Sequence, residues 1–447
     1  MSKNFLELER INHLESVADY IINSALKAKA QASVSISVSE GHEIAVANRK
    51  LEALEFKGGL SLDINWYYDN RSLSYSSSDI TSYSISQALD SIQSKVKFLE
   101  PDPFSGLPDK SFLAYDYQDL DLYHDWDCSI EQQIEMAKEC EIIALELDQR
   151  IKQCESSNLN ASKIFNLHAN TLGLKAQYLG SYYSMSCCLL TEDQGGQMHR
   201  DYDYTVARNP AKLDSITKLA NSAAKNTLGR LGAKSIKSQK AKVLFSPKMS
   251  RSLVTCLLSA ISGRNIYRNS SFLRDSLNKS IFPDFVNIID DPTIKQGMAS
   301  SYFDSEGVKT HKRHIIKDGI LQGYLLSSYS ARKLGMTPTG NAGGSHNICV
   351  LPSVENKDIL GLLGTGILIT DMMGQGLNIL TGDFSKGAFG FWVENGEIVC
   401  PVQEFTIAGN LIDMYKNIIA IGDDLDTQSS IQTGSWLLES MTIAGSL

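Results

Sequence analysis

Histidine is the residue that most often binds a catalytic metal, and three places in the chain could use it. His42-Glu43 is the one His-Glu pair, but a zinc helix of the HExxH type needs a second imidazole one turn later, and none follows. His311 and His314 stand beside two cationic residues, which disfavour a metal ion. His346 lies in the glycine-rich segment GNAGGSHN, and loops of this kind often carry catalytic groups. The alternative is that His346 only hydrogen-bonds to nearby backbone.

The carboxylates Asp371 and Asp383 flank a second glycine-rich segment. They could act as a general acid and base, or they could cap turns, which is the commoner use of aspartate beside glycine. Gly374 and Gly376 form a GxG pair without the third glycine and the strand-turn-helix unit of a nucleotide site. The motifs GxxxxGK[ST] and GxSxG are absent from the sequence. These spacings therefore indicate no catalytic constellation.

The segment 365–410 organises the C-terminal half. Glycine is unfavourable inside regular elements, so its frequency here indicates tight turns or close backbone contacts. Asn395-Gly396, between two apolar runs, is the strongest hairpin signal in the chain. We expect this segment and the loop of GNAGGSHN to form either one wall of a peptide groove or only a structural core. The residues concerned are Gly343, Gly344, His346, Asp371, Gly374, Gly376, Gly382 and Asp383.

Composition limits the classes of function. The chain has 447 residues, of which 42 are basic and 51 acidic, and a net charge of −9 argues against nucleic-acid binding. Eight scattered cysteines form no CxxC pair, which fits a reducing cytoplasm. No secretory signal and no membrane-spanning run are visible. We therefore expect a cytoplasmic protein with neither nucleic acid nor membrane as a partner.

The N-terminal half alternates helical and strand-like patterns. Phe5–Lys29 has helical spacing, several strands follow up to Ser77, and Ser78-Asp79 is expected to cap a helix that ends near Phe98. The pattern recurs after a proline-rich break, with a helix expected at Ser129–Cys154, further strands, and a helix at 211–231. This predicts an internal α-βββ-α duplication with repeats at 1–100 and 128–232.

The C-terminal half is predicted to be mainly β. A short strand leads into an apolar helix in VLFSPKMSRSLVTCLLSAISG, and Asp318-Gly319 marks a hairpin. The fold class is therefore α+β, with a layered N-terminal α/β domain at 1–232. A glycine-rich, barrel- or sandwich-like domain is expected at 240–447.

Long runs in the C-terminal third resemble the TldD/PmbA family, and within it the PmbA (TldE) branch. Among them are YRNSSFLRDSLNKSI, TGNAGGSHN, DMMGQGLNILTGDFSKGAFGFWVENGEIVCPVQEFTIAGNL and GSWLLESMTIAG. Members of this family are described as modulators of DNA gyrase or as peptide-maturation proteins. The resemblance covers most of residues 267–447 and more loosely the rest.

The resemblance implies a heterodimer in which a TldD-type partner carries the zinc on HExxxH and a C-terminal cysteine. At the corresponding positions this chain has Leu257, Leu258, Ser262 and Thr433. Leucine has no donor atom, and neutral hydroxyls are poor zinc ligands. The resemblance therefore implies no catalytic, cofactor or metal residue in this chain, and zinc in the partner instead.

The leading hypothesis is a non-catalytic TldE-type subunit of a cytoplasmic metalloprotease that processes peptides and unfolded segments. Whether the isolated chain is an enzyme, or forms a homodimer when alone, stays open. One alternative is a self-sufficient metallopeptidase of the same family, with a site that includes His346 or the pair His311 and His314. Another is a non-proteolytic regulator that binds gyrase or an antitoxin.

Overall fold

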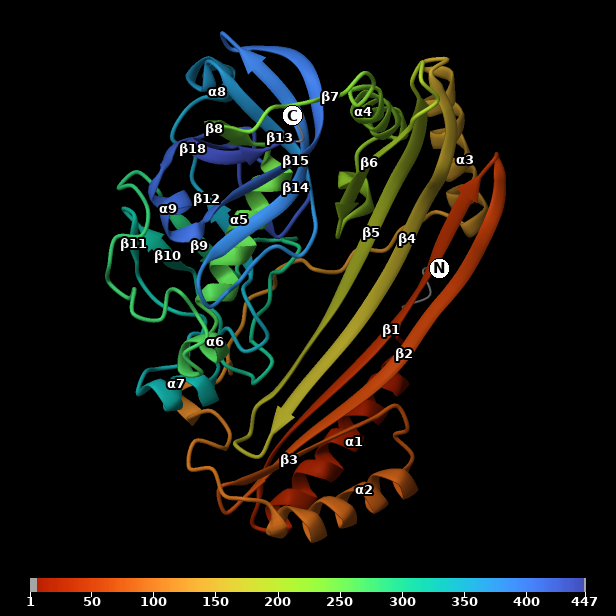
Figure 1. The fold of residues 1–447 in the computed structure, drawn as a ribbon. Coiled ribbons are helices and arrows are strands. Elements are labelled where there is room, and N and C mark those ends of the chain that lie inside the picture. Colours follow the sequence, from red (N-terminus) through yellow and green to blue (C-terminus); the bar gives the residue numbers. More distant parts are fainter. Residues whose placement is uncertain (1–5, 446–447) are drawn as a thin grey trace.

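Six antiparallel strands form a long N-terminal sheet in the order β3-β2-β1-β4-β5-β6 (Figure 1). The computed structural model describes residues 6–445, with the side chains of residues 356 and 357 left out. The N-terminal elements are α1 (Leu8–Lys27), β1 (Gln31–Ala47), β2 (Lys50–Tyr68), β3 (Arg71–Ser77), α2 (Ser82–Lys95), α3 (Ile130–Glu146), β4 (Ile151–Asn170), β5 (Lys175–Glu192), β6 (Met198–Ala207) and α4 (Ile216–Leu228).

The element order confirms the predicted α-βββ-α duplication. Each unit runs helix, three strands, helix, and the first strands of the two units, β1 and β4, pair antiparallel at the centre of the sheet. Gly41 lies opposite Ser162 in this pair, and a Cβ at Gly41 would come within 2.3 Å of the Ala161 carbonyl oxygen. The two units therefore join through a backbone contact that admits only glycine at this position.

Several predicted boundaries were wrong by a few residues. The helix expected at Ser129–Cys154 ends at Glu146, and Ile151 already begins β4, because Asp148 caps a turn between them through the N–H of Arg150. The cap of α2 is Thr81, whose hydroxyl accepts the Ser84 N–H, and not Ser78-Asp79. The start predicted at Phe5 falls outside the described residues. The separate strands expected within residues 31–68 merge into β1 and β2.

The two faces of the sheet differ in polarity. Along β1, the side chains of Val34, Ile36 and Val38 pack against α1 and α2, and Ile44 and Val46 pack against α3. Strand residues alternate between faces, so the intervening serines lie on the opposite face. All four long helices therefore cover one face, and a polar face is left toward the C-terminal half.

A closed five-stranded barrel forms the centre of the C-terminal half. The strands β18-β8-β13-β14-β15 are neighbours, and pairing of β15 with β18 closes the ring. The hairpin predicted at Asn395-Gly396 is confirmed, since both residues have positive φ between β14 and β15. The elements are β7 (Lys234–Ser235), β8 (Gln239–Phe245), α5 (Pro247–Ala260), α6 (Gly263–Tyr267), β9 (Ile288–Asp291), β10 (Arg313–Lys317), β11 (Ile320–Leu321), α7 (Ser328–Leu334), β12 (Asn347–Val350), α8 (Asn356–Leu363), β13 (Gly366–Met373), β14 (Asp383–Glu394), β15 (Glu397–Asn410), α9 (Leu411–Lys416), β16 (Ile418–Ile421), β17 (Ile431–Gln432) and β18 (Trp436–Ala444).

Partly buried cations hold the two halves together. Arg230, just after α4, contacts Asp201 at 2.6 Å and Asp371 of the barrel at 2.7 Å. Lys248 of α5 lies 2.6 Å from Asp203 of β6. These pairs fix how the polar face of the sheet meets the C-terminal half. We propose to divide the chain here, into a domain at 1–232 and a domain at 240–447.

No helix within residues 6–445 combines the length and the apolar character needed to cross a membrane.

Candidate functional site

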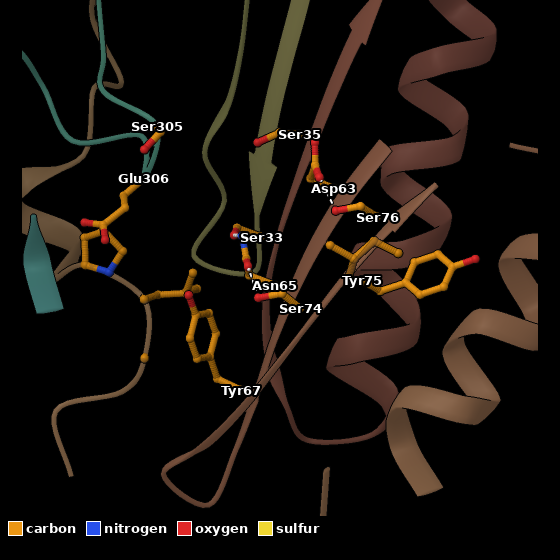
Figure 2. Close-up of a pocket in the computed structure, with 14 residues that line it drawn as sticks. Ser33, Ser35, Asp63, Asn65, Tyr67, Ser74, Tyr75, Ser76, Ser305 and Glu306 are labelled. Atoms are coloured by element: carbon orange, nitrogen blue, oxygen red, sulfur yellow. Dashed lines mark hydrogen bonds between the residues drawn. The ribbon is translucent and has the colours of Figure 1, made fainter. Parts of the chain in front are cut away.

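A polar cavity separates the serine-rich face of the sheet from the loops of the C-terminal half. We call it the sheet groove. One part, of about 470 Å³, is lined by residues that include Ser33, Asp63, Tyr67, Ser76 and Glu306 (Figure 2). A second part, of about 380 Å³, shares Ser35, Asp63 and Ser305 with the first and extends to His168 and His346. Both volumes fall in the range typical of ligand sites.

The C-terminal wall of the sheet groove is a pair of loops joined by Asp304. Its carboxylate accepts the N–H groups of Glu306 at 2.9 Å, Val308 at 3.0 Å and Ala342 at 2.9 Å. Gly343 and Gly344 follow with φ of +105° and +127°, a region that side chains other than glycine rarely adopt. The glycines thus let the chain turn back along the groove directly after this carboxylate.

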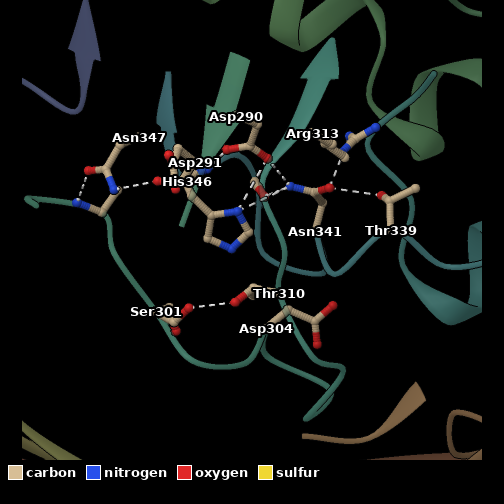
Figure 3. A network of polar contacts seen from close by, with 12 residues as sticks. Asp290, Asp291, Ser301, Asp304, Thr310, Arg313, Thr339, Asn341, His346 and Asn347 are labelled. Carbon is tan, nitrogen blue, oxygen red and sulfur yellow. Dashed lines mark hydrogen bonds and ion pairs between the residues drawn. The ribbon is translucent and has the colours of Figure 1, made fainter. Parts of the chain in front are cut away.

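His346 is held in a buried network behind this loop (Figure 3). Asp290 accepts its N–H at 2.9 Å, and the second carboxylate oxygen accepts the Asn341 amide at 2.8 Å. Arg313 donates to the Asn341 side-chain oxygen at 3.0 Å. Burial by itself raises the pKa of Asp290, but the hydrogen bonds and charge of His346, together with the other donors, bring it below its ordinary value.

His168 of β4 is a buried imidazole in the wall of the sheet groove. Its Nδ1 lies 3.0 Å from the Ser35 hydroxyl, and its Nε2 has no hydrogen-bond partner among the described residues. Burial lowers its pKa to about 4, so the ring is neutral near pH 7. The Nε2 atom is enclosed by protein, beside the backbone of Glu306 and Gly307, so the ring is part of the wall.

A second cavity, the helix pocket, lies on the other side of the loop that carries Gly343 and Gly344. It measures about 500 Å³, and α5 and α6 contribute Leu258, Ser262 and Arg264. None of its described lining residues is a histidine, cysteine, aspartate or glutamate. The polar groups of the pocket wall therefore include serine and threonine hydroxyls and the guanidinium of Arg264, and none of them commonly binds zinc.

Of the four positions at which the resemblance predicts the counterparts of a zinc motif, two line the helix pocket and two are buried. Leu257 is fully buried in the core of the barrel half, and Leu258 and Ser262 line the pocket. Thr433 is also buried, and its hydroxyl accepts the indole N–H of Trp436 at 2.8 Å. These side chains do not fit a zinc ion. Across the described part of the chain, no three His, Cys, Asp or Glu side chains are grouped so as to hold a metal.

Asp371 and Asp383 do not form a carboxylate pair, because each has partners of its own. Asp371 binds Arg230, and Asp383 accepts the Thr381 hydroxyl at 2.7 Å and the Asn410 amide at 3.1 Å. The three glycines of this segment have a conformational or packing role in the barrel half. Gly374 and Gly382 have positive φ, and Gly376 lies directly against the Ser385 backbone. None of these five residues lines the sheet groove or the helix pocket.

The remaining histidines singled out from the sequence do not form a site. His42 lies further along β1 than the groove residues Ser33 and Ser35 and contacts Gln133 of α3 at 2.6 Å. His314 is exposed on β10. His311 is exposed just before that strand, near enough to Asp290 and His346 for their charges to act on its pKa.

Sequence reasoning missed Asp63, His168 and Glu306, which line the groove, and Asp290, which is buried behind its loop. The available signal was the run of alternating serines in β1, which marks a sheet face that stays polar. Nothing local to Glu306 indicated that it would lie across from this face.

Comparison with known proteins places the chain in a family. Residues 123–231 match the family model for the PmbA/TldA metallopeptidase central domain, and residues 238–445 match the one for the C-terminal domain. The chain is 42% identical to Metalloprotease PmbA of Escherichia coli over 93% of its own length and 92% of that protein. It is 39% identical to the Metalloprotease PmbA homolog of Haemophilus influenzae, over 97% and 96% of the two chains.

The chain belongs to the PmbA/TldD family. Two crystal structures share its fold. A Bacteroides thetaiotaomicron protein named as a modulator of DNA gyrase superposes with a TM-score of 0.91 at 27% identity, over 97% of this chain and 99% of the other. TldE from Thermococcus kodakarensis superposes with a TM-score of 0.83 at 20% identity, over 96% and 100%. The latter likeness shows the fold alone.

Proposed function

We propose that this chain is the non-catalytic, TldE-type subunit of a TldD–TldE zinc metalloprotease that processes peptides and unfolded polypeptide segments in the cytoplasm. The observation that carries the proposal is the helix pocket. The positions that would hold the metal are Leu257, Leu258, Ser262 and Thr433, and the described pocket residues include no zinc-binding side chain. The zinc would therefore sit in a partner of the TldD type.

Relatives of both kinds support the partnership. The fold is that of TldE from Thermococcus kodakarensis, and the chain is also 24% identical over 71% of its length to the Metalloprotease TldD homolog of Buchnera aphidicola. Its eight cysteines are free thiols, as expected of a protein in a reducing compartment. In this role Gly343, Gly344 and His346 contribute to a peptide-binding wall, whereas Asp371, Gly374, Gly376, Gly382 and Asp383 stabilise the barrel half.

The test compares three preparations: this chain alone, a TldD-type chain that carries HExxxH alone, and the two chains after co-expression. The TldD-type chain is taken from the same cell. We expect the two chains to elute as a stable complex on size-exclusion chromatography. Cleavage of an unfolded peptide should require the TldD-type partner and should be inhibited by a chelator. Elemental analysis should find no stoichiometric zinc in the isolated chain. Zinc-dependent cleavage by the isolated chain would overturn the proposal.

A second candidate is a self-sufficient metallopeptidase, favoured by the names of the PmbA relatives. It requires stoichiometric zinc in the pure chain, and its metal site would have to include His346 or the pair His311 and His314. A third is a gyrase-binding regulator, favoured by the name of the Bacteroides structure. Recovery of gyrase without a TldD-type chain in a pull-down would support it.

A further inference from the structure

The polar face of the N-terminal sheet is lined with hydroxyl and amide groups on three neighbouring strands. Within the sheet groove these are Ser33 and Ser35 of β1, Asn65 of β2, and Ser74 and Ser76 of β3. Asn65 accepts the Ser74 hydroxyl at 2.7 Å and donates to Ser33 at 3.5 Å. Such a surface offers both donors and acceptors, as the backbone of an extended polypeptide requires.

Two carboxylates line this cavity from opposite walls. Figure 2 shows Asp63 on the sheet wall and Glu306 on the opposite wall, which belongs to the C-terminal half. Asp63 accepts the hydroxyls of Ser61, at 2.9 Å, and Ser76, and Glu306 accepts the Ser328 N–H at 2.8 Å. A carboxylate has about four lone-pair sites, so both groups can accept further hydrogen bonds.

The cations that normally neutralise such carboxylates are missing from the walls. No lysine or arginine is among the described residues that line either part of the sheet groove. Tyr67 adds a neutral donor, since burial and the nearby Glu306 carboxylate raise the pKa of its phenol to about 12. Arg332 lies behind this wall, where it donates to the carbonyl oxygens of Gly106 and Leu107, and its charge opposes the rise in the pKa of Tyr67. The charged side chains that line the groove itself are therefore carboxylates, in a setting where a charge pair is stronger than in water.

His168 is a buried imidazole in the wall of the groove. Its side chain is 3% exposed, and its Nε2 is enclosed by protein beside the backbone of Glu306 and Gly307. Because burial lowers its pKa to about 4, the ring is neutral near pH 7 and adds no charge to the groove.

We propose that the sheet groove binds an extended polypeptide segment through its lysine or arginine side chains, with a cationic group placed between Asp63 and Glu306. The peptide class rests on the proposed function, whereas the preference for a cation rests on the groove alone. The serine hydroxyls and the amide bind the backbone of the peptide, so many peptide sequences are tolerated. The two carboxylates select peptides with positively charged side chains. This would make the chain the subunit that selects basic segments.

The test uses the full chain without a partner and three fluorescein-labelled ten-residue peptides, which alternate serine with lysine, with glutamate or with glutamine. Fluorescence anisotropy at low salt should show the lysine peptide binding at least tenfold more tightly than the other two. This preference should weaken in 0.5 M salt, as charge pairing near a surface does. Equal binding of the three peptides would overturn the proposal.

Matched variants locate the site. The double variant Asp63→Asn, Glu306→Gln changes the net charge from −9 to −7 (−9 + 2) and keeps the side-chain size and one acceptor oxygen at each position. The control Asp284→Asn, Glu397→Gln makes the same change at exposed positions outside the groove. We expect a loss of at least fivefold in lysine-peptide affinity for the first and less than twofold for the second. Equal losses would show non-specific attraction and overturn the proposal.

A third arm separates a peptide from a free polyamine. Spermidine should compete only weakly with the lysine peptide, because it cannot use the donors of the groove. Spermidine binding that is sensitive to the double variant, without any peptide binding, would also overturn the proposal. These outcomes are independent of complex formation with a TldD-type chain, so the two proposals can fail separately. Thermal melting of each variant verifies that it is folded.

Discussion

The Asp290 carboxylate accepts the backbone N–H of His346 at 2.9 Å and lies 3.3 Å from its ring Nδ1. One side chain of β9 thus fixes both the backbone and the ring at the end of the glycine-rich loop that separates the two cavities. Asn341, at the start of that loop, is bound to the same carboxylate. The buried Asp290 carboxylate therefore holds both ends of the loop, at Asn341 and at His346.

Replacing this carboxylate should destabilise the protein. Asp290→Asn keeps the size but puts an amide donor where Asn341 and His346 need an acceptor, so we expect the free energy of unfolding to fall by about 1–3 kcal/mol. Urea denaturation at pH 7 measures it. Asp284→Asn, at an exposed position, is the control and should change stability by less than about 0.5 kcal/mol. Equal effects would mean that the network contributes little.

His168 predicts a loss of stability on acidification. Its pKa is about 4 in the folded protein, below the ordinary value of 6.5, so the unfolded chain binds more protons between these values. The stability is complete above pH 6.5 and is lost as the pH falls toward 4, by an amount on the order of 3 kcal/mol at most, at about 1.4 kcal/mol per pKa unit.

The variant His168→Asn tests this assignment because asparagine does not titrate. Chemical denaturation at several values between pH 7 and pH 4 should give a shallower pH dependence for the variant than for the native sequence. Parallel curves would assign the acid sensitivity to other groups.

Leu257 should behave as a core residue, although the resemblance aligns it with a zinc motif. It is fully buried in the barrel half, so Leu257→Ala should lower the free energy of unfolding by about 2–5 kcal/mol. Leu351→Ala is the control, since Leu351 is 42% exposed and should cost much less. Denaturation curves measure both, and a near-neutral Leu257→Ala would contradict the packing described here.

Gly376 tests the backbone contact inside the glycine-rich region. A Cβ at this position would lie 1.4 Å from the Ser385 carbonyl oxygen. Gly376→Ala must therefore displace either the segment around Gly376 or the segment around Ser385, which are hydrogen-bonded to each other. We expect a loss of more than about 2 kcal/mol in the free energy of unfolding. In contrast, Gly361→Ala in α8 meets nothing within 4 Å and should be neutral or stabilising, by up to about 1 kcal/mol. Thermal melting distinguishes the two, and similar shifts would be unexpected.

Local sequence patterns were sufficient wherever near neighbours decide the structure. Asn395-Gly396 predicted its hairpin because few other residue pairs adopt two consecutive positive φ values. The alternation of apolar residues predicted the repeated α-βββ-α units, although it placed the end of α3 too late. Helix ends depend on where the next strand finds its partners, and Ile151 is already paired in β4.

Residue identity alone also predicted that Leu257, Leu258, Ser262 and Thr433 would not hold zinc, because leucine has no donor atom and neutral hydroxyls are poor ligands. The sheet groove, by contrast, was decided only by the tertiary structure. Asp63 and Glu306 lie in different halves of the chain, and each looks like an ordinary surface acid in its own segment. They line one cavity because contacts such as the salt bridge Arg230–Asp371 hold the polar sheet face against the C-terminal half. Residues so far apart in the sequence leave no pattern in either segment that would predict this arrangement.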